Sequence, residues 1–331
     1  MLTNSRILIT GGAGFIGSNL VETFLKCGNQ VICLDDLSTG KKENISEFLT
    51  NKNFTFIQGD IRNFETCRKS CEGVEFVFHH AALGSVPRSI KNPIATSEVN
   101  IMGFLNVLTA ARDAKVKKII YASSSSVYGD DATLPKIESR IGKPLSPYAI
   151  TKRVNELFAE NFSRLYGLET IGLRYFNVFG KKQDPNGAYA AVIPKFIAAL
   201  IKHESPIING DGTISRDFTF VDNVVHANQL TAISPIPQPT TINQQLSTIF
   251  NIACGQTTSI NELFHIIRSE LTKYDSSISS IQPIYGASRK GEILHSNADI
   301  TQAMTLIGYS SKFSVLEGLK EIVKYYLNLA K

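Results

Sequence analysis

The chain has 331 residues, of which 43% are hydrophobic and 19% are charged, and it contains 23 glycines and 12 prolines. This composition is typical of a soluble globular protein and excludes collagen, a disordered chain and a coiled coil. The length is sufficient for roughly two domains with a large buried core. The net charge of +5 is not gathered in a dense basic tract, so nucleic acid is not an expected partner, whereas an anionic small substrate would suit the charge.

The cysteines, at positions 27, 33, 67, 71 and 254, are five in number and form no Cys-x-x-Cys pair. This spacing predicts neither a disulfide framework nor a zinc site, so we expect reduced thiols in the cytoplasm and no metal. A charged segment followed by an apolar segment is not seen at the N-terminus, and no apolar run approaches the ~18 residues of a membrane-spanning helix. The sequence therefore predicts neither export nor membrane insertion.

Short β-rich runs alternate with longer helical stretches from residue 6 to about residue 176. Continuous apolar strands separated by helix-length segments indicate a parallel sheet that is covered by helices on both faces. The expected fold class is therefore α/β, with a doubly wound parallel sheet of the Rossmann type. The predicted strands are Arg6–Thr10, Gln30–Asp35, Phe54–Gln58, Val74–His79, Lys118–Ser124 and Glu169–Tyr175.

The pattern changes after Phe176. A stretch rich in Gly, Asn and Pro over 177–190 precedes a helix-like run over 191–202 and a turn at 209–212, which indicates a second, more irregular lobe. The Pro-rich segment 234–248 is interpreted as a surface loop. The predicted division is a dinucleotide-binding domain over 1–176, with a returning segment near 213–253, and a smaller lobe over 177–212 and 254–331.

A glycine-rich turn links the first predicted strand to a helix expected over Ser18–Lys26. The spacing Gly11-x-x-Gly14-x-x-Gly17 allows a tight turn, close approach of backbone N–H groups to a pyrophosphate, and close packing of the helix on the strand. Asp35 ends the second strand, where its carboxylate can accept hydrogen bonds from an adenosine ribose and repel a 2′-phosphate. The sequence therefore favours NAD over NADP.

Asp60 follows the third predicted strand. Its position suits contact with the adenine, but a solvated aspartate in a turn fits the spacing equally well.

Tyr148 and Lys152 are four residues apart at the start of a helix-like stretch, so a helix places both on one face. Four serines, Ser123 to Ser126, end the fifth predicted strand, and ligands of open parallel sheets bind at the carboxyl ends of strands. A nearby ammonium and an oxidised nicotinamide would favour a tyrosine phenolate, which can take a hydroxyl proton. The sequence predicts a dehydrogenase-like centre here. The alternative is a purely structural role, in which Tyr148 and Lys152 lie on a partly exposed helix face and the serines cap the end of a strand.

The glycine turn, Asp35, Ser124, Tyr148 and Lys152 together resemble the extended short-chain dehydrogenase/reductases over essentially the whole chain. Within that family the sequence is similar to the nucleotide-sugar 4-epimerases of the UDP-galactose 4-epimerase type. It is most similar to the UDP-N-acetylglucosamine 4-epimerase group that supplies bacterial surface polysaccharides such as O-antigen. The supporting blocks are His80-Ala81-Ala82, Gly84 to Ser89, Arg174 to Asn177, Gln183 to Tyr189 and Arg216-Asp217-Phe218.

The resemblance implies site residues by position. Ser124, Tyr148 and Lys152 are implied to be catalytic. The implied cofactor-binding residues are Gly11, Gly14, Phe15, Ile16, Gly17, Asp35, Asp36, Asp60, Ile61, Ala81, Ala82, Asn100, Lys152 and Tyr175. The implied substrate-binding residues are Gly84, Ser85, Arg88, Ser124, Ser125, Ser126, Tyr148, Asn177, Gln183, Ala191, Val192, Arg216, Arg289, Glu292 and Ser296.

For some of these positions the resemblance also implies a particular role. Arg216 and Arg289 are expected to bind a diphosphate, because guanidinium pairs bidentately with phosphate, and Glu292 is expected to bind the uridine ribose. Asp36 stands where relatives often carry asparagine, and its charge further disfavours NADP. Ser296 stands where epimerases restricted to glucose and galactose carry a tyrosine, so it leaves room for an acetamido group; the alternative is a small residue in a packed turn.

The implied reaction is 4-epimerisation of UDP-N-acetylglucosamine and UDP-N-acetylgalactosamine through a transient 4-keto sugar, with NAD reduced and reoxidised in one cycle. UDP-glucose/UDP-galactose and UDP-uronate epimerases remain alternatives. A dehydratase is less expected, because Ser125 rather than an acidic residue follows Ser124. A non-catalytic NAD-binding scaffold is less expected still, because the chain keeps the Tyr and the Lys. The resemblance also implies a homodimer formed by helices over 100–114 and 148–166.

Overall fold

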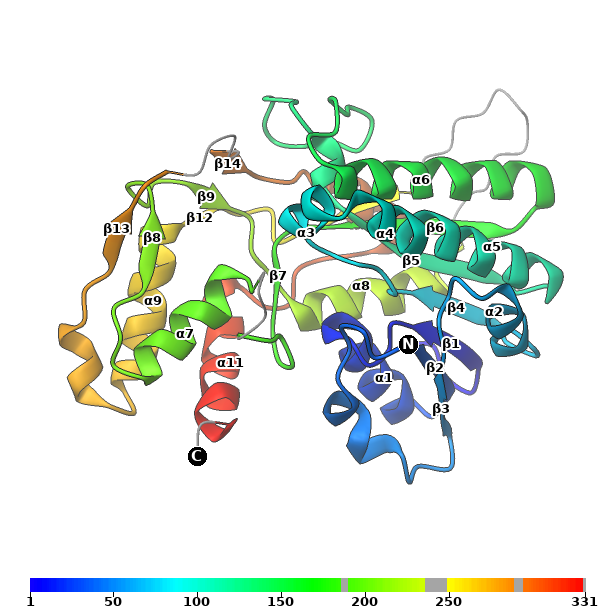
Figure 1. Ribbon diagram of the computed structural model, residues 1–331, viewed down its shortest axis with the longest axis horizontal. Helices are drawn as coiled ribbons and strands as arrows, with labels where there is room; N and C mark the ends of the chain where they lie inside the picture. The colour runs from blue at the N-terminus through cyan, green and yellow to red at the C-terminus, as the bar shows by residue number, and fades with distance from the viewer. Residues whose placement is uncertain (186–189, 236–248, 289–293, 330–331) are drawn as a thin grey trace.

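The computed structural model describes residues 1–185, 190–235, 249–288 and 294–329. Their largest element is a sheet of seven strands in the order β11-β6-β5-β4-β1-β2-β3, and every neighbouring pair in it is parallel. Figure 1 shows this sheet between two layers of helices. The strands are β1 (Arg6–Thr10), β2 (Gln30–Asp35), β3 (Phe54–Gln58), β4 (Phe76–His79), β5 (Lys118–Ser124), β6 (Glu169–Tyr175) and β11 (Ile249–Ile252).

Each face of the sheet has its own hydrophobic core. Alternate residues of a strand point to opposite faces, so Ile7 and Ile9 join one core while Leu8 joins the other. The first core lies under α1 (Phe15–Lys26), α8 (Val221–Ile233) and α10 (Thr301–Ile307). The second lies under α2 (Phe64–Ser70), α5 (Phe104–Asp113) and α6 (Pro147–Tyr166). The predicted doubly wound α/β class is thereby confirmed.

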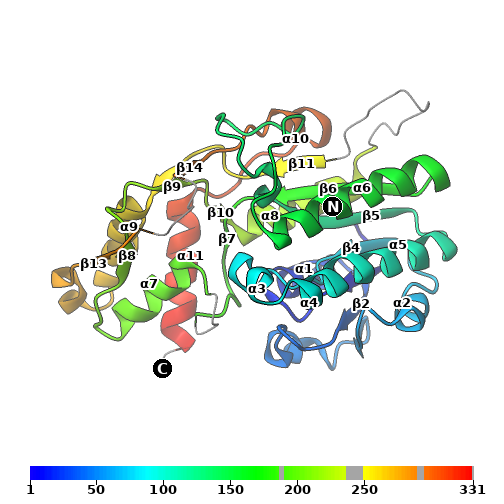
Figure 2. The same cartoon turned by 45° about the horizontal axis from the view of Figure 1, so that its top comes forward.

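A smaller lobe lies beside the sheet (Figure 2). Three helices, α7 (Val192–Ile201), α9 (Ile260–Thr272) and α11 (Val315–Leu329), enclose its hydrophobic core. Its strands are short. β7 (Val178–Phe179) pairs with β10 (Thr219–Phe220), β8 (Ile207–Asn209) pairs with β13 (Ile284–Gly286), and β9 (Ser215–Arg216) lies between β12 (Thr258–Ser259) and β14 (His295–Ser296).

Short elements complete the described chain. They are the 3-10 helices η1 (Lys42–Phe48), η3 (Ser125–Tyr128) and η4 (Ser276–Ser280), the π-helical segment η2 (Glu98–Gly103), and the helices α3 (Val86–Lys91) and α4 (Pro93–Ser97).

Two elements begin at other residues than predicted, and α7 (Val192–Ile201) is one residue shorter at each end than the predicted run over 191–202. α1 begins at Phe15, three residues before the predicted Ser18, because the Ser18 N–H already donates to the Gly14 carbonyl at 3.0 Å. β4 begins at Phe76 rather than Val74, because the Val74 N–H donates back to Cys71 in a turn that closes α2.

The predicted division of the chain needs two corrections. β9, which was expected in the segment returning to the large domain, pairs with β12 and β14 of the smaller lobe. α10, which was expected in the lobe, packs on β11, and its Ala303 and Ile307 lie in the core of the large sheet. Strands of two residues carry no readable periodicity, and a short helix does not reveal which core it joins. The Pro-rich segment lies outside the described residues from 236 onward.

The continuous helical run Pro93–Asp113 has the length and composition of a membrane span, and 44% of its most apolar window is buried inside the protein. The sequence analysis expected no run of this kind. Its second half is α5, whose Phe104, Val107 and Leu108 pack on the sheet. This run is therefore explained as a core helix of the fold.

Candidate active site

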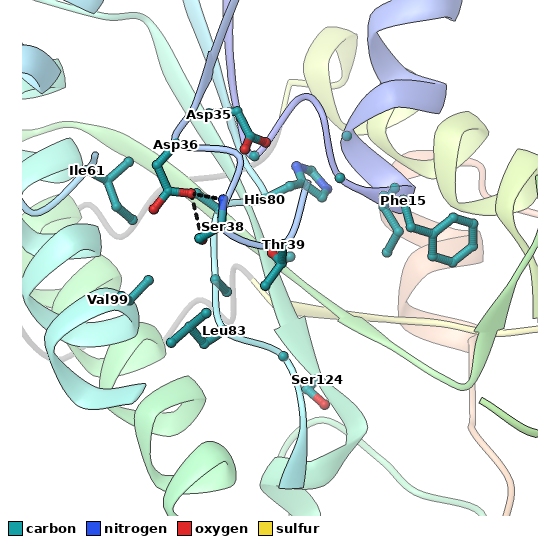
Figure 3. Close-up of a pocket in the computed structure, with 18 of the residues that line it drawn as sticks. Phe15, Asp35, Asp36, Ser38, Thr39, Ile61, His80, Leu83, Val99 and Ser124 are labelled. Atoms are coloured by element: carbon teal, nitrogen blue, oxygen red, sulfur yellow. Dashed lines mark hydrogen bonds between the residues drawn. The ribbon is translucent and has the colours of Figure 1, made fainter. Parts of the chain in front are cut away.

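A cavity of about 440 Å³ opens at the carboxyl ends of β1, β2, β4, β5 and β6 (Figure 3). This is where open parallel sheets bind ligands. The predicted site residues that line it are Gly11, Gly14, Phe15, Ile16, Gly17, Asp35, Asp36, Asp60, Ile61, Ala81, Ala82, Gly84, Arg88, Ser124, Tyr148, Lys152 and Tyr175.

The glycine turn can take no side chain at two positions. Gly11 has φ of +70°, and a Cβ there would lie 2.5 Å from the backbone nitrogen of Ala81. A Cβ on Gly17 would collide with the carbonyl oxygen of Gly11, across the helix–strand contact. Gly14 caps α1, so the first N–H groups of this helix face the cavity without helical partners. The turn is therefore built to hold an anionic group.

Asp35 and Asp36 lie at the end of β2. The Asp35 carboxylate is buried and accepts hydrogen bonds from Ala13 N–H at 2.9 Å and Leu37 N–H at 2.8 Å. Burial raises the pKa of Asp35, although these backbone donors act against the rise. Asp36 accepts from the N–H and the hydroxyl of Ser38. Asp35 thus fixes the glycine turn and retains lone pairs toward the cavity.

Asp60 and Ile61 line the cavity beyond β3. Arg62 pairs with Asp60 at 2.6 Å and lowers its pKa, so this carboxylate is also held by its own turn. Asn100 does not line the cavity. It is buried, accepts from the Leu83 N–H at 2.8 Å and donates to Thr151 at 3.1 Å. Asn100 therefore shapes the wall that follows β4.

Ser124, Tyr148 and Lys152 converge on one end of the cavity. Ser146 caps α6 by accepting from the Ala149 N–H at 3.1 Å, and Pro147 begins the helix, which fixes where Tyr148 stands. Burial raises the pKa of Tyr148, and a hydrogen bond with the Ser124 side chain lowers it. Lys152 Nζ donates to the Ala122 carbonyl at 2.7 Å and lies 5.9 Å from the Tyr148 ring centroid.

Burial also lowers the pKa of Lys152 to about 8, with the charge of Glu156 acting in the opposite direction. The Tyr148 phenol therefore lies at the cavity wall beside the Lys152 ammonium, whose pKa is lowered. This pair can accept and hold a proton from a bound hydroxyl group.

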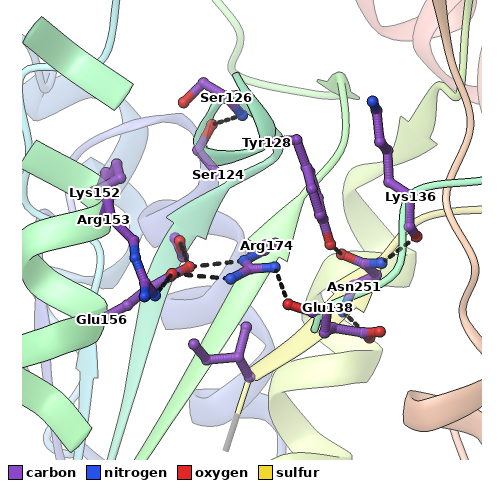
Figure 4. A network of polar contacts seen from close by, with 12 residues as sticks. Ser124, Ser126, Tyr128, Lys136, Glu138, Lys152, Arg153, Glu156, Arg174 and Asn251 are labelled. Atoms are coloured by element: carbon purple, nitrogen blue, oxygen red, sulfur yellow. Dashed lines mark hydrogen bonds and ion pairs between the residues drawn. The ribbon is translucent and has the colours of Figure 1, made fainter. Parts of the chain in front are cut away.

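The other predicted serines lie just beyond the cavity lining. Ser126 N–H donates to Ser124 Oγ at 3.1 Å in η3, as Figure 4 shows. The Ser126 hydroxyl is shielded from solvent and has no hydrogen-bond partner among the described residues. Ser125 begins η3, and Ser85 caps α3 by accepting from the Arg88 N–H at 3.2 Å. The unsatisfied Ser126 hydroxyl is a ready donor or acceptor for a ligand.

The lobe residues of the predicted site lie apart from the cavity lining. Asn177 adopts φ of 35° and donates to the Asp217 carbonyl at 3.1 Å. Gln183 Nε2 donates to Val178, and its Oε1 has no partner among the described residues. Arg216 and Ser296 pair in register between β9 and β14. Ala191 caps α7 and Val192 begins it, whereas Arg289 and Glu292 lie outside the described residues.

Several residues that line the cavity were not predicted from the sequence. Among them, His80 contacts a predicted site residue and has a ring nitrogen without a hydrogen-bond partner in the described ranges. Its Nε2 lies 2.9 Å from the Tyr175 hydroxyl, and its Nδ1 has no partner in the described chain. Burial lowers the pKa of His80 to about 3, so this ring is neutral. His80 directly follows β4, and this position at the carboxyl end of a strand could have indicated that it lines the cavity. Further missed residues are Ser38, Thr39, Leu83, Val99 and Val178.

The geometry defines an enzyme of the dinucleotide-dependent class. A cradle without side chains at Gly11 and Gly17, a buried carboxylate at the end of β2, and a Tyr–Lys pair at the far end together fit an NAD molecule laid across the sheet edge. Among the described residues no cluster of three metal-ligating side chains is found.

Comparisons with known proteins agree with this class. Residues 7–243 match the family model of the NAD dependent epimerase/dehydratase family. A putative UDP-glucose 4-epimerase of Methanocaldococcus jannaschii is 39% identical over 97% of this chain and 98% of its own length.

Two solved structures are also similar. A UDP-N-acetylglucosamine 4-epimerase of Methanobrevibacter ruminantium, in complex with UDP-N-acetylmuramic acid, is 39% identical, with a TM-score of 0.89 over 99% of this chain and all of that one. A UDP-glucuronic acid 4-epimerase of Bacillus cereus, in complex with UDP-glucuronic acid and NAD, is 31% identical, with a TM-score of 0.84 over 98% of this chain and 99% of that one.

The chain belongs to the NAD-dependent epimerase/dehydratase family. It is an enzyme of the nucleotide-sugar 4-epimerase type, and NAD is its cofactor. The predicted family, fold and cofactor are thereby confirmed. The roles of individual site residues and the identity of the sugar stay predictions.

Proposed function

We propose that this protein is an NAD-dependent 4-epimerase that interconverts UDP-N-acetylglucosamine and UDP-N-acetylgalactosamine. The observation that carries the proposal is the meeting of Ser124, Tyr148 and Lys152 at one end of a cavity whose other end is the glycine cradle. The similarity to the M. ruminantium epimerase over the whole chain supports an acetamido sugar. Ser296 supports it as well, because a serine stands where epimerases restricted to glucose and galactose carry a tyrosine.

The side chains at the Tyr–Lys end carry the proton chemistry. Tyr148 accepts the proton of the sugar 4-hydroxyl, and Ser124, which hydrogen-bonds with Tyr148, orients that hydroxyl. Lys152 stabilises the Tyr148 phenolate by its charge, both before the phenolate takes the hydroxyl proton and after the Tyr148 phenol has returned that proton to the sugar oxygen. Bound NAD+ supplies a hydride acceptor that returns the hydride in the same cycle. The residues thus serve both directions of one reaction.

The lobe residues hold the nucleotide while the sugar turns. We assign Asn177 and Gln183 to the nucleotide-sugar, Arg216 and Arg289 to the diphosphate, and Glu292 to the uridine ribose. Firm anchoring of the UDP and looser contact with the hexose are what a rotating keto intermediate requires. The unpartnered Oε1 of Gln183 and hydroxyl of Ser126 are the contacts that the described structure leaves open for this role.

The experiment is an assay of the purified protein by NMR. UDP-N-acetylglucosamine, UDP-N-acetylgalactosamine, UDP-glucose, UDP-galactose and the corresponding uronates are incubated separately. We expect the acetamido pair to equilibrate without net formation of NADH. Exclusive turnover of the plain hexoses or the uronates would overturn the substrate assignment. A stoichiometric demand for added NAD+ would overturn the epimerase reaction.

A uronate substrate is the second candidate, because Arg88 lines the cavity wall after β4. A guanidinium there would pair with a carboxylate at carbon 6 of the sugar. The similarity to a UDP-glucuronic acid 4-epimerase is in keeping with this alternative.

We also propose that the protein acts as a homodimer through the helices predicted over 100–114 and 148–166, the first of which belongs to the continuous helical run Pro93–Asp113. Apolar side chains of these helices are exposed, and Ile94 is 71% exposed. The other exposed apolar side chains on these helices are Met102, Ile150, Leu157, Leu165 and Tyr166. Such a patch marks a protein–protein contact. Light scattering of the intact protein should give a dimer that Ile94→Asp converts to monomer, whereas Ile233→Asp on α8 leaves it intact; a monomeric wild type would refute the proposal.

A further inference from the structure

Helix α6 carries a buried carboxylate one turn beyond Lys152. Glu156 lies four residues after Lys152, so both side chains stand on the same face of the helix, and the Glu156 side chain is fully shielded from solvent. Arg174 on β6 donates to both of its oxygens, through Nε at 2.8 Å and Nη2 at 3.0 Å. Figure 4 shows this pair beneath the catalytic end of β5. The carboxylate is therefore held on the side of α6 that carries the catalytic lysine.

The same carboxylate holds the end of β5. Ser123 Oγ donates to Glu156 Oε1 at 2.6 Å, and Ser123 stands between Ala122, whose carbonyl accepts from Lys152, and Ser124. Two successive residues of β5 are thus tied to two successive turns of α6. A displacement of Glu156 would move the strand end and the helix relative to each other.

Arg174 is itself fixed from three directions. Its Nη1 donates to the Glu138 carbonyl at 3.0 Å, and its guanidinium lies 4.9 Å from the centroid of the Tyr128 ring. Tyr128 in turn donates to Asn251 on β11 at 2.6 Å. Because the partners of Arg174 come from different elements, the position of Glu156 is determined by the sheet and not by α6 alone.

Glu156 also acts on Lys152 by charge. Burial lowers the pKa of Lys152 to about 8, and the negative charge of Glu156 opposes this fall. The other groups facing Lys152 are Tyr148 on the same helix, His79 at the end of β4 and His80 directly after it; burial lowers the pKa of both histidines, so both rings are neutral.

The groups that face Glu156 itself are Arg174, Arg153 at 3.1 Å, Ser123, and the phenol of Tyr121 on β5. Arg153 is partly exposed and lies on the same helix. Arg174 is therefore the buried cation that competes with Lys152 for the charge of Glu156.

We propose that Glu156 is a positioning residue of the epimerase centre, which aligns the end of β5 with α6 and keeps Lys152 protonated. This inference rests on the proposed roles of Ser124, Tyr148 and Lys152. The assignment concerns a residue that lines no part of the cavity and touches no ligand directly. It acts on the reaction only through Ser123 and Lys152.

The test measures the pKa of Lys152 directly, by NMR titration of protein labelled with 13C at the lysine Cε, with the Lys152 signal assigned from Lys152→Arg. Glu156→Gln should lower that pKa by about one to two pH units, the size expected for the loss of a charge one helical turn away at an effective dielectric constant of about 20. Arg174→Met should raise it, because Lys152 then becomes the main cation beside Glu156. Glu160→Gln is the matched control, an exposed carboxylate one turn further on the same helix, and should leave it unchanged.

Activity gives a second readout of the same proposal. The alkaline limb of the kcat profile should move to lower pH in Glu156→Gln, whereas Ser123→Ala should lower kcat several-fold with KM unchanged and without moving that limb. If Glu156→Gln fails to fold, Arg174→Met tests the effect of the Glu156 charge on the pKa of Lys152. Glu156→Asp keeps the charge, so the pKa of Lys152 in that variant should stay near the wild-type value. A Lys152 pKa in Glu156→Gln and Arg174→Met that equals the wild-type value would overturn the proposal. The titration needs no sugar, so a wrong substrate assignment would leave it intact.

Discussion

Three glycines that line the cavity differ in how much space surrounds an added Cβ atom, so glycine-to-alanine variants can test the cofactor cradle in steps. A Cβ on Gly84 meets nothing within 4 Å, a Cβ on Gly14 meets only the Gly11 carbonyl at 3.2 Å, and a Cβ on Gly17 collides with that carbonyl. The variants Gly84→Ala, Gly14→Ala and Gly17→Ala therefore add the same methyl group at decreasing clearance. Only at Gly17 must α1 move away from β1 to make room.

The magnitudes follow from this clearance. Gly84→Ala should change the free energy of unfolding by less than about 0.5 kcal/mol, and Gly17→Ala should lower it by about 1–3 kcal/mol, the usual cost of overpacking. With an unfolding entropy of about 2.1 cal/mol/K per residue, a chain of this length loses about 1.4 °C of Tm per kcal/mol. Gly17→Ala should thus melt about 1.5–4 °C below the wild type, with Gly14→Ala between the two.

The assay combines thermal unfolding with calorimetric titration of NAD+. Affinity for NAD+ should fall in the same order as stability, and most at Gly17, because the displaced helix no longer directs its N–H groups at the pyrophosphate. A Gly17→Ala variant with wild-type Tm and wild-type NAD+ affinity would refute the cradle. Equal losses in Gly84→Ala would refute the clearance argument.

The remaining predictions concern the substrate end of the cavity. Tyr148→Phe should lower kcat by about 10²–10⁴-fold, the usual contribution of a general base, with unchanged Tm and NAD+ affinity; near-normal turnover would place the base elsewhere. Ser296→Tyr should abolish turnover of UDP-N-acetylglucosamine by steric exclusion while sparing any activity on UDP-glucose, and an undiminished acetamido activity in parallel assays would reject Ser296 as the gate. Arg88→Ala should reduce kcat/KM for UDP-uronates far more than for neutral UDP-sugars, whereas equal losses on both would remove the carboxylate role of Arg88.

The fold was predictable because its signals are local. The strand patterns of Ile7 to Ile9 and Ile119 to Tyr121 and the glycines of the first turn each act over a few residues. Register and strand order then follow from the doubly wound architecture. The small strands of the lobe were not predictable, since β9 consists of Ser215 and Arg216 alone, and two residues show no alternation.

The cavity lining was predictable where a residue follows directly from a strand end, as for Asp35, Ser124 and Tyr175. His80 follows β4 in the same way, but no local pattern indicates that its ring lies beside Tyr175, 95 positions away. The sequence also placed Asn100 in contact with the cofactor, whereas the structure shows its side chain bonded to Leu83 and Thr151 behind the wall. Contacts of this kind depend on how the loops close over the sheet.

Serine 123 shows why neighbours in sequence can have opposite roles. Ser123 and Ser124 read as one polar cluster, yet successive residues of a strand face opposite sides of the sheet. Ser124 hydrogen-bonds with Tyr148 on the first turn of α6, while the Ser123 hydroxyl donates to the buried Glu156 further along the same helix. Burial of a carboxylate costs free energy unless the carboxylate is fully paired. The donors around Glu156, from Ser123 and Arg174, offset this cost. The Ser123 hydroxyl thus fixes the strand end, and the neighbouring Ser124 hydroxyl is left to contact a ligand in the cavity.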